Sequence, residues 1–193
     1  MSKYKLIYAD PPWSFNNKKT GGSMRSGADA QYNTMSIEDL KNLDVESLCD
    51  DDCILVMWWV GSQPQEAIDL VKAWGFTIKN MNGLVWRKLT KNMLDFFGMG
   101  FWTRAGSESA IIATKGKPKP ASRSVRAVSS HVVGKHSEKP QHFRDACIEL
   151  AGDVPRLEMF SRGNFKGWDV FGNECKNSVT IKNKVKLTEE DLK

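Results

Sequence analysis

Asp10, Pro11, Pro12 and Trp13, near the start of the chain, combine groups that could do chemistry. The apolar residues 5–9 (KLIYA) precede them and predict a buried strand, so Asp10 is expected where that strand ends. Ligands of open α/β sheets bind at the carboxyl ends of the strands. The sequence therefore predicts an active site at Asp10 to Trp13.

These four residues predict a rigid patch of hydrogen-bond acceptors. Proline has a fixed φ and no N–H, so Pro11 and Pro12 add only carbonyl oxygens to the carboxylate of Asp10. Such a patch suits an exocyclic amino group on a planar ring, which would stack on the indole of Trp13. Holding both amino hydrogens would aim the nitrogen lone pair at an electrophile. The alternative interpretation is an Asp-Pro turn beside a buried tryptophan.

Two polar stretches are candidates for binding nucleic acid. Residues 14–31 have no periodicity and are rich in Gly and Ser, which predicts a flexible loop able to act as a lid or clamp. The segment from Ser109 to Ser137 holds basic residues and no acid, which suits phosphate contacts, although a solvated loop is the alternative. The candidate contacts in these stretches are Phe15, Lys18, Lys19, Arg25, Arg123 and Arg126.

Composition predicts one ordinary globular domain. The chain has 193 residues, 40% hydrophobic and 26% charged, with a net charge of +5. No apolar run approaches the roughly 18 residues of a membrane span, and no signal peptide is visible, so we expect a cytoplasmic protein without a membrane partner. The four cysteines contain no CxxC pair, and no metal site is expected.

Strand-like and helix-like segments alternate along the chain, which predicts an α/β fold with a mainly parallel, Rossmann-like sheet. Cys53–Val60 is continuously apolar, as in a central parallel strand, and Asp50–Asp52 before it suggest a turn. We expect one domain over residues 1–175 and a tail, 176–193, that forms a strand and helical turn or frays. The other expected strands are 76–79, 84–87, 108–114, 125–133, 156–160 and 168–171, and the expected helices begin at 36, 64 and 140.

Asp10-Pro-Pro-Trp13 resembles the signature of the MT-A70 family of N6-adenine methyltransferases. That family includes the catalytic subunit of the eukaryotic mRNA adenosine methyltransferase and many bacterial and phage enzymes. The resemblance covers nearly the whole chain, and four further blocks follow in the family's order. These blocks are Tyr32–Ser36, Gly100–Glu108 continuing to Pro118, His136–Pro140, and Leu157–Arg162 with Gly167–Glu174.

The resemblance implies a Rossmann-like methyltransferase fold with helices on both faces of the sheet and the catalytic strand before the cofactor strand. It also implies S-adenosyl-L-methionine as cofactor; this molecule has no pyrophosphate, so the absence of GxGxxG is no obstacle. The residues implied for its methionine carboxylate and ribose diol are Lys139, Arg162, Asn164, Asn173 and Glu174. Arg104 and Glu108 match positions that the family places near the substrate base.

The expected function is transfer of a methyl group to the N6 amino group of adenine in DNA, in a bacterial or phage-infected cell. Asp10 would orient the amine for direct in-line transfer rather than act as a strong base. The alternatives are the same chemistry on RNA, and a catalytically silent subunit that only binds nucleic acid. Because relatives often work as dimers, a homodimer is also expected.

Overall fold

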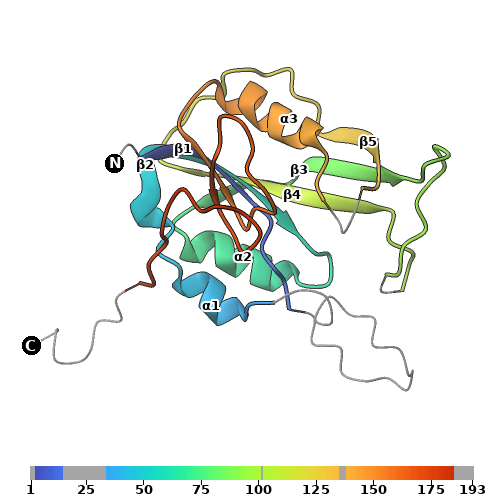
Figure 1. Ribbon diagram of the computed structural model, residues 1–193, viewed down its shortest axis with the longest axis horizontal. Helices are drawn as coiled ribbons and strands as arrows, with labels where there is room; N and C mark the ends of the chain where they lie inside the picture. The colour runs from blue at the N-terminus through green and yellow to red at the C-terminus, as the bar shows by residue number, and fades with distance from the viewer. Residues whose placement is uncertain (1–2, 15–33, 101, 135–137, 185–193) are drawn as a thin grey trace, which may run out of the picture.

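The computed structural model describes residues 3–14, 34–100, 102–134 and 138–184. These residues form a seven-stranded sheet in the order β5-β3-β4-β2-β1-β6-β7, with α3 over one face and α1 and α2 over the other (Figure 1). The predicted α/β fold with helices on both faces is confirmed. The elements are β1 (Tyr4–Ala9), α1 (Ile37–Asn42), the 3-10 turn η2 (Glu46–Leu48), β2 (Cys49–Trp59), α2 (Pro64–Ala73), β3 (Thr77–Leu89), β4 (Ser107–Lys115), β5 (Val128–Val132), α3 (Gln141–Ala151), β6 (Arg156–Met159) and β7 (Asp169–Phe171).

The sheet is mainly parallel, with one strand running the other way. β1 is parallel to β2 and to β6, β6 is parallel to β7, and β3 is parallel to β5. β4 is antiparallel to both β2 and β3. The expectation that residues 53–60 form a parallel strand therefore holds only on the β1 side of β2. A strand buried on both faces has the same apolar pattern whichever direction its neighbours run.

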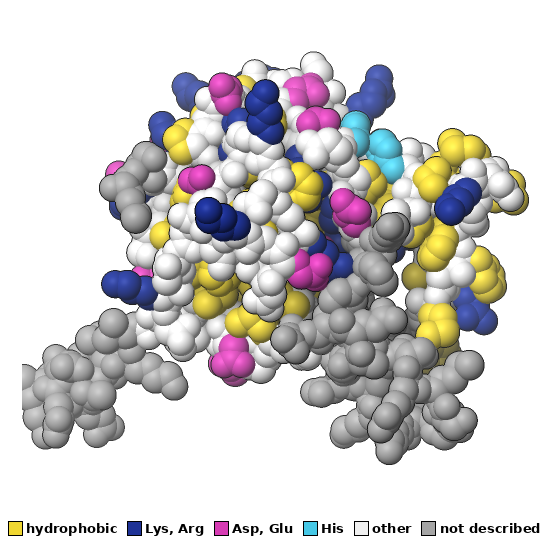
Figure 2. Space-filling model, viewed as in Figure 1, with side chains coloured by type: hydrophobic (Ala, Val, Ile, Leu, Met, Phe, Trp, Pro, Cys, Tyr) yellow, Lys and Arg dark blue, Asp and Glu magenta, His cyan; other side chains and the backbone are white. Residues whose placement is uncertain are grey.

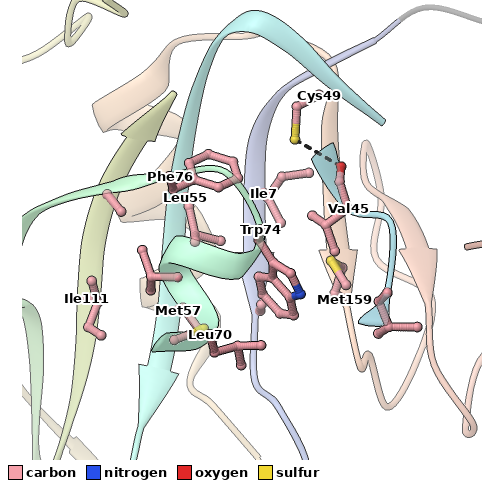
Figure 3. Packing of buried hydrophobic residues seen from close by; sticks show 14 of the residues in the cluster. Ile7, Val45, Cys49, Leu55, Met57, Leu70, Trp74, Phe76, Ile111 and Met159 are labelled. Carbon is pink, nitrogen blue, oxygen red and sulfur yellow. Dashed lines mark hydrogen bonds between the residues drawn. The ribbon is translucent and has the colours of Figure 1, made fainter. Parts of the chain in front are cut away.

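The core has two halves because successive side chains of β1 point to opposite faces of the sheet. Ile7 and Ala9 join a cluster with α1 and α2, whereas Leu6 and Tyr8 join a cluster with α3. Figure 3 shows the first cluster, in which Trp74 at the end of α2 lies close to Ile7. With cover on both faces, the centre of the sheet is a rigid frame for the residues that follow β1.

Two local predictions are wrong. Asp50–Asp52 belong to β2 rather than to a turn, because a register shift opposite β1 lets extra residues bulge out with exposed side chains at positions 51 and 52. The expected strands 76–79 and 84–87 are not separate: residues 77–79 and 84–87 are parts of β3, which runs unbroken through Asn80 and Asn82. Its register shifts between Ile78 and Leu84, so polar residues that resemble a turn are absorbed as irregularities within one strand.

The tail is packed against the core as far as residue 184. Asp44 N–H donates to the carbonyl of Lys182 at 2.8 Å, and Lys184 N–H donates to the carbonyl of Asn42 at 2.7 Å. Asn183 forms an isolated bridge to Leu43, and residues 176–184 contain no strand longer than this bridge. This part of the tail therefore closes over the end of α1, while residues 185–193 lie outside the described part of the chain.

Candidate active site

Asp10 lies where three parallel strands end together. Ala9 of β1 pairs with Met159 of β6, which pairs in turn with Phe171 of β7. The residues that follow these three, including Asp10, therefore meet at one edge of the sheet. Asp10 N–H donates to the carbonyl of Met159 at 3.4 Å, and the side chain is 26% exposed, so it borders both core and solvent.

The two prolines are held in a fixed turn. The carbonyl of Pro11 accepts the N–H of Trp13 at 2.9 Å, and the carbonyl of Pro12 accepts the N–H of Met35 at 3.2 Å. Each carbonyl oxygen keeps a second lone pair that a substrate N–H could use. Backbone hydrogen bonds therefore hold the patch in place and already use part of its acceptor capacity.

Trp13 was expected to offer its indole face for stacking, but in the structure the ring is buried. Its side chain is 6% exposed and belongs to the core cluster with Ile7. The indole N–H donates to the carbonyl of Trp58 in β2 at 3.2 Å. In this structure the ring anchors the turn after Asp10 to the neighbouring strand, and stacking of a substrate on it stays a prediction.

An ion cluster brings together three of the predicted residues, which lie far apart in the sequence. The ammonium Nζ of Lys139, just before α3, lies 2.8 Å from Asp10 Oδ2 and 2.9 Å from Glu108 Oε2. Glu108 Oε1 accepts from Lys88 Nζ, on β3. The Lys139 ammonium also lies 5.2 Å from the ring centroid of Trp58, a favourable cation–π distance. The result is an alternating row of charges: Asp10, Lys139, Glu108 and Lys88.

Burial alone would favour the neutral forms of Lys139 and Glu108, in the middle of this row, but their charged neighbours keep both groups ionised. Burial lowers the pKa of Lys139, and the carboxylates of Asp10 and Glu108 outweigh it, so the pKa is raised overall. Burial raises the pKa of Glu108, and the ammonium groups of Lys139 and Lys88 outweigh it, so this pKa is lowered. Both groups are therefore ionised at neutral pH.

Lys88 is the member of the cluster that the sequence analysis missed. Trp86, two residues earlier on the same strand, is fully buried. Residues two apart in a strand share a face, so the alternation places Lys88 on the buried side. A lysine in that position needs a charged partner, and this was the available signal.

A second, fully buried ion pair stands behind the site. The guanidinium of Arg144 on α3 donates to both carboxylate oxygens of Glu158 on β6, at 2.7 Å each. The same guanidinium lies over the ring of Phe165 at 3.5 Å and donates to the carbonyl of Lys139 at 3.3 Å. Arg144 therefore ties together the start of α3, β6 and the loop after β6. The sequence analysis did not identify this pair.

The loops after β6 and β7 are the predicted cofactor segments. Phe160 has a positive φ of 61°, which turns the chain sharply as β6 ends. Ser161 N–H then donates to the carbonyl of Phe171 at 3.0 Å, joining the two loops. Arg162 is half-buried in the first loop, and Asn173 and Glu174 are exposed in the second. These polar residues follow strands that end beside Asp10.

Asn164 is engaged by the tail. Its amide nitrogen donates to the carbonyl of Lys176 and its amide oxygen accepts the N–H of Lys176, both at 3.0 Å. Asn177 Oδ1 accepts the N–H of Gly172 at 2.8 Å. In this structure Asn164 fastens the loop after β6 to the tail, and a contact with a cofactor stays a prediction.

The structure does not bring the other predicted residues to the Asp10 cluster. Arg104 lies on the segment between β3 and β4, with its guanidinium 4.8 Å from the ring centroid of Phe97. This segment projects from the body of the protein, and Figure 2 shows its many exposed apolar side chains. The most exposed large ones are Met93, Leu94, Phe97, Met99 and Trp102. Phe15, Lys18, Lys19 and Arg25 lie outside the described residues.

The basic segment between β4 and β5 begins at the opposite edge of the sheet from Asp10. Lys115 pairs with Cys53 near the amino end of β2, and Lys117 N–H donates to Asp52 Oδ1 at 2.6 Å. The segment then passes the end of α3, where Ala121 N–H donates to the carbonyl of Leu150 at 2.8 Å. Arg123 and Arg126 are exposed along this path. Any nucleic acid that they bind would have to extend over the α3 face.

Among the described residues, no three or more His, Cys, Asp or Glu side chains are grouped so that they could hold a metal ion. None of the helices in the described part of the chain is both long enough and apolar enough to cross a membrane.

Comparison with known proteins identifies the relatives of this chain. The family model MT-A70 matches residues 4–174. A Type II methyltransferase, M.MunI, from a Mycoplasma species is 36% identical over 188 residues, which cover 89% of this chain and 78% of that protein. An N(6)-adenosine-methyltransferase MT-A70-like protein from Drosophila melanogaster is 25% identical over 90% of this chain, which spans only 27% of the fly protein.

Proposed function

This chain belongs to the MT-A70 family of methyltransferases, and from this premise we propose that it methylates the N6 amino group of adenine in DNA, using S-adenosyl-L-methionine. The observation that carries the proposal is the position of Asp10. Its carboxylate, a hydrogen-bond acceptor, directly follows the carboxyl end of β1 and precedes two prolines. A carboxylate and rigid carbonyls at this edge suit an amino group on a planar base.

The relatives favour DNA and keep RNA as the second candidate. The bacterial relative with 36% identity is a Type II methyltransferase, which favours DNA as the substrate of this chain. The fly relative is named as an N(6)-adenosine-methyltransferase, which favours RNA. The intact Asp10 to Trp13 turn favours an active enzyme over a silent subunit.

The residues at the carboxyl edge fit the proposed cofactor. When bound, S-adenosyl-L-methionine supplies a methyl group on a sulfonium, and it must be held by its amino-acid carboxylate and its ribose diol. Arg162 would bind the carboxylate; at the diol, Glu174 would accept hydrogen bonds and Asn173 would donate or accept them. Lys139 is already shared between Asp10 and Glu108, so a cofactor carboxylate would compete with them for it.

Asp10 would contribute by orientation and charge. Its Oδ2 is held by Lys139, and its second oxygen can accept a hydrogen from the adenine amine while a proline carbonyl accepts the other. As the new C–N bond forms, positive charge develops on the amine nitrogen, and the carboxylate stabilises it. The amine becomes strongly acidic only at this stage, so its proton can leave to solvent without a strong base.

A single assay tests the proposal. The protein is incubated with methyl-labelled cofactor and matched duplex DNA, single-stranded DNA or RNA, and each product is digested to nucleosides. We expect N6-methyladenine from a DNA substrate. Labelled RNA alone would support the second candidate, and no methylated adenine on any substrate, with cofactor binding shown, would exclude both enzyme activities.

We propose that Arg123 and Arg126 contact nucleic-acid phosphates. Changing both to alanine should reduce the slope of log affinity against log salt by about 2, because each lost phosphate contact removes about one released counterion. Titrations at several salt concentrations measure the slope. Lys72→Ala with Lys79→Ala is the matched control, since it removes the same charge from exposed positions elsewhere. Equal slopes for the two double variants would argue for a solvated loop.

A homodimer is also proposed. The exposed apolar side chains between β3 and β4 would supply a suitable surface, because monomeric proteins seldom expose large contiguous apolar patches.

A further inference from the structure

Lys88 is a nearly buried lysine to which no role has been assigned so far. Its side chain is 12% exposed, and its ammonium pairs with Glu108 Oε1. The ammonium also lies 5.0 Å from the ring centroid of Trp86 and 5.9 Å from that of Phe96. These contacts hold the lysine on one side of Glu108. Lys88 is therefore not an ordinary solvated surface lysine.

The two oxygens of Glu108 serve two different cations. Oε1 accepts from Lys88, and Oε2 lies 2.9 Å from Lys139 Nζ. Lys139 Nζ lies in turn 2.8 Å from Asp10 Oδ2. Three successive ion pairs therefore link Lys88 to Asp10, the group that we propose orients the amine. Among the residues that the structure describes, the ion pairs that connect Lys88 with Asp10 run through Glu108 and Lys139.

We propose that Lys88 is a positioning residue for methyl transfer: by holding one oxygen of Glu108, it keeps the other directed at Lys139, so that Lys139 is shared and does not bind Asp10 alone. An Asp10 carboxylate paired fully with an ammonium would be a weaker acceptor for the substrate amine. This inference rests on the proposed function, and it adds a residue that touches neither substrate nor cofactor in that proposal.

The charges explain why Lys88 is needed. With Lys88 in place, two carboxylates face two ammonium groups and the row is neutral. Without Lys88, Glu108 and Asp10 would compete for one ammonium, and the half-buried Glu108 would be protonated more readily. A protonated Glu108 would release Lys139 to Asp10. The charged groups that face Glu108 in the described structure are Lys88 from β3 and Lys139 before α3, with Asp10 beyond Lys139.

The test compares Lys88→Met with the wild type across pH. We expect the acidic limb of kcat/KM to move to higher pH by about one unit, since a nearby opposite charge typically lowers a carboxyl pKa by at least that much. Lys88→Arg, which restores the charge, should return the limb toward its original position. A merely structural role would lower the melting temperature and the rate but leave the limb where it was, and that result would overturn the proposal.

Lys115→Met is the matched control. Lys115 lies at the other end of the same strand as Glu108 and pairs with Glu46 at 3.7 Å, so its loss removes an ion pair of similar kind away from Asp10. Its acidic limb should coincide with that of the wild type. Equal shifts in Lys88→Met and Lys115→Met would show a general charge effect and would also overturn the proposal.

A second measurement does not depend on methyl transfer. The carboxyl carbon of Glu108 can be followed by ¹³C NMR in protein labelled at glutamate, with Glu108→Gln used to assign the resonance. Lys88→Met should raise the pH at which this carboxyl titrates, even if the protein methylates none of the substrates offered. An unchanged titration would overturn the role of Lys88, whereas absent methyl transfer with a shifted titration would contradict only the proposed function.

Discussion

Asp10→Ala is expected to lower the rate of methyl transfer by about a thousandfold while leaving the affinity for S-adenosyl-L-methionine nearly unchanged. One preorganised electrostatic contact to the reacting group typically contributes a factor of about 100 to 1,000 in rate. Lys139 would keep its partner Glu108, so the variant should not lose the ammonium from the site. Single-turnover transfer and calorimetric binding of the cofactor measure the two quantities separately.

Asp10→Asn is the matched variant, because it keeps the shape of the side chain and one acceptor oxygen while removing the charge. It should fall between the wild type and Asp10→Ala in rate. If cofactor affinity drops as far as the rate in either variant, Asp10 binds the cofactor rather than orienting the amine, and the proposed division of roles is wrong.

Glu158→Gln is expected to reduce the free energy of unfolding by about 3–5 kcal/mol, because it leaves the buried guanidinium of Arg144 without its counter-charge. Arg144 and Glu158 are almost completely shielded from solvent, and their two hydrogen bonds are both 2.7 Å long. Urea unfolding at neutral pH, with a check that the slope is unchanged, measures the effect.

Asp153→Asn is the control for that measurement. Asp153 pairs with Arg156 at 2.8 Å, but its side chain is 91% exposed, so its loss should cost no more than about 1 kcal/mol. The double variant Arg144→Met with Glu158→Leu should recover much of the stability, since apolar residues of similar size often replace a buried ion pair at little cost. A cost below about 1 kcal/mol for Glu158→Gln would show that the pair contributes little.

The fold was largely predictable because several of its strands coincide with continuous apolar runs in the sequence. β1 and β2 stand out as buried strands, and the Ser36 cap marks the start of α1. The antiparallel direction of β4 was not predictable in the same way. Burial on both faces fixes which residues are apolar but not which way the neighbouring strand runs.

Three members of the ion cluster were singled out from the sequence, but their contacts were not predictable. Asp10, Glu108 and Lys139 were identified through their blocks of sequence, yet Asp10 and Lys139 are 129 positions apart, and nothing local predicts their ion pair. Lys88 and Arg144 were missed because a charged residue on a strand or helix is normally solvated. Only the folded chain supplies the partners that keep these two residues buried and charged.

The pairing of β1 with β6 also has a consequence for biosynthesis. During synthesis of the chain, one edge of β1 (residues 4–9) cannot be hydrogen-bonded until residues 156–159 of β6 have been made. At a translation rate of roughly 5–20 residues per second, the first strand spends on the order of ten seconds with an unpaired apolar edge. Such an edge invites pairing with other chains. Expression yield should therefore depend on chaperones that shield this segment of the nascent chain.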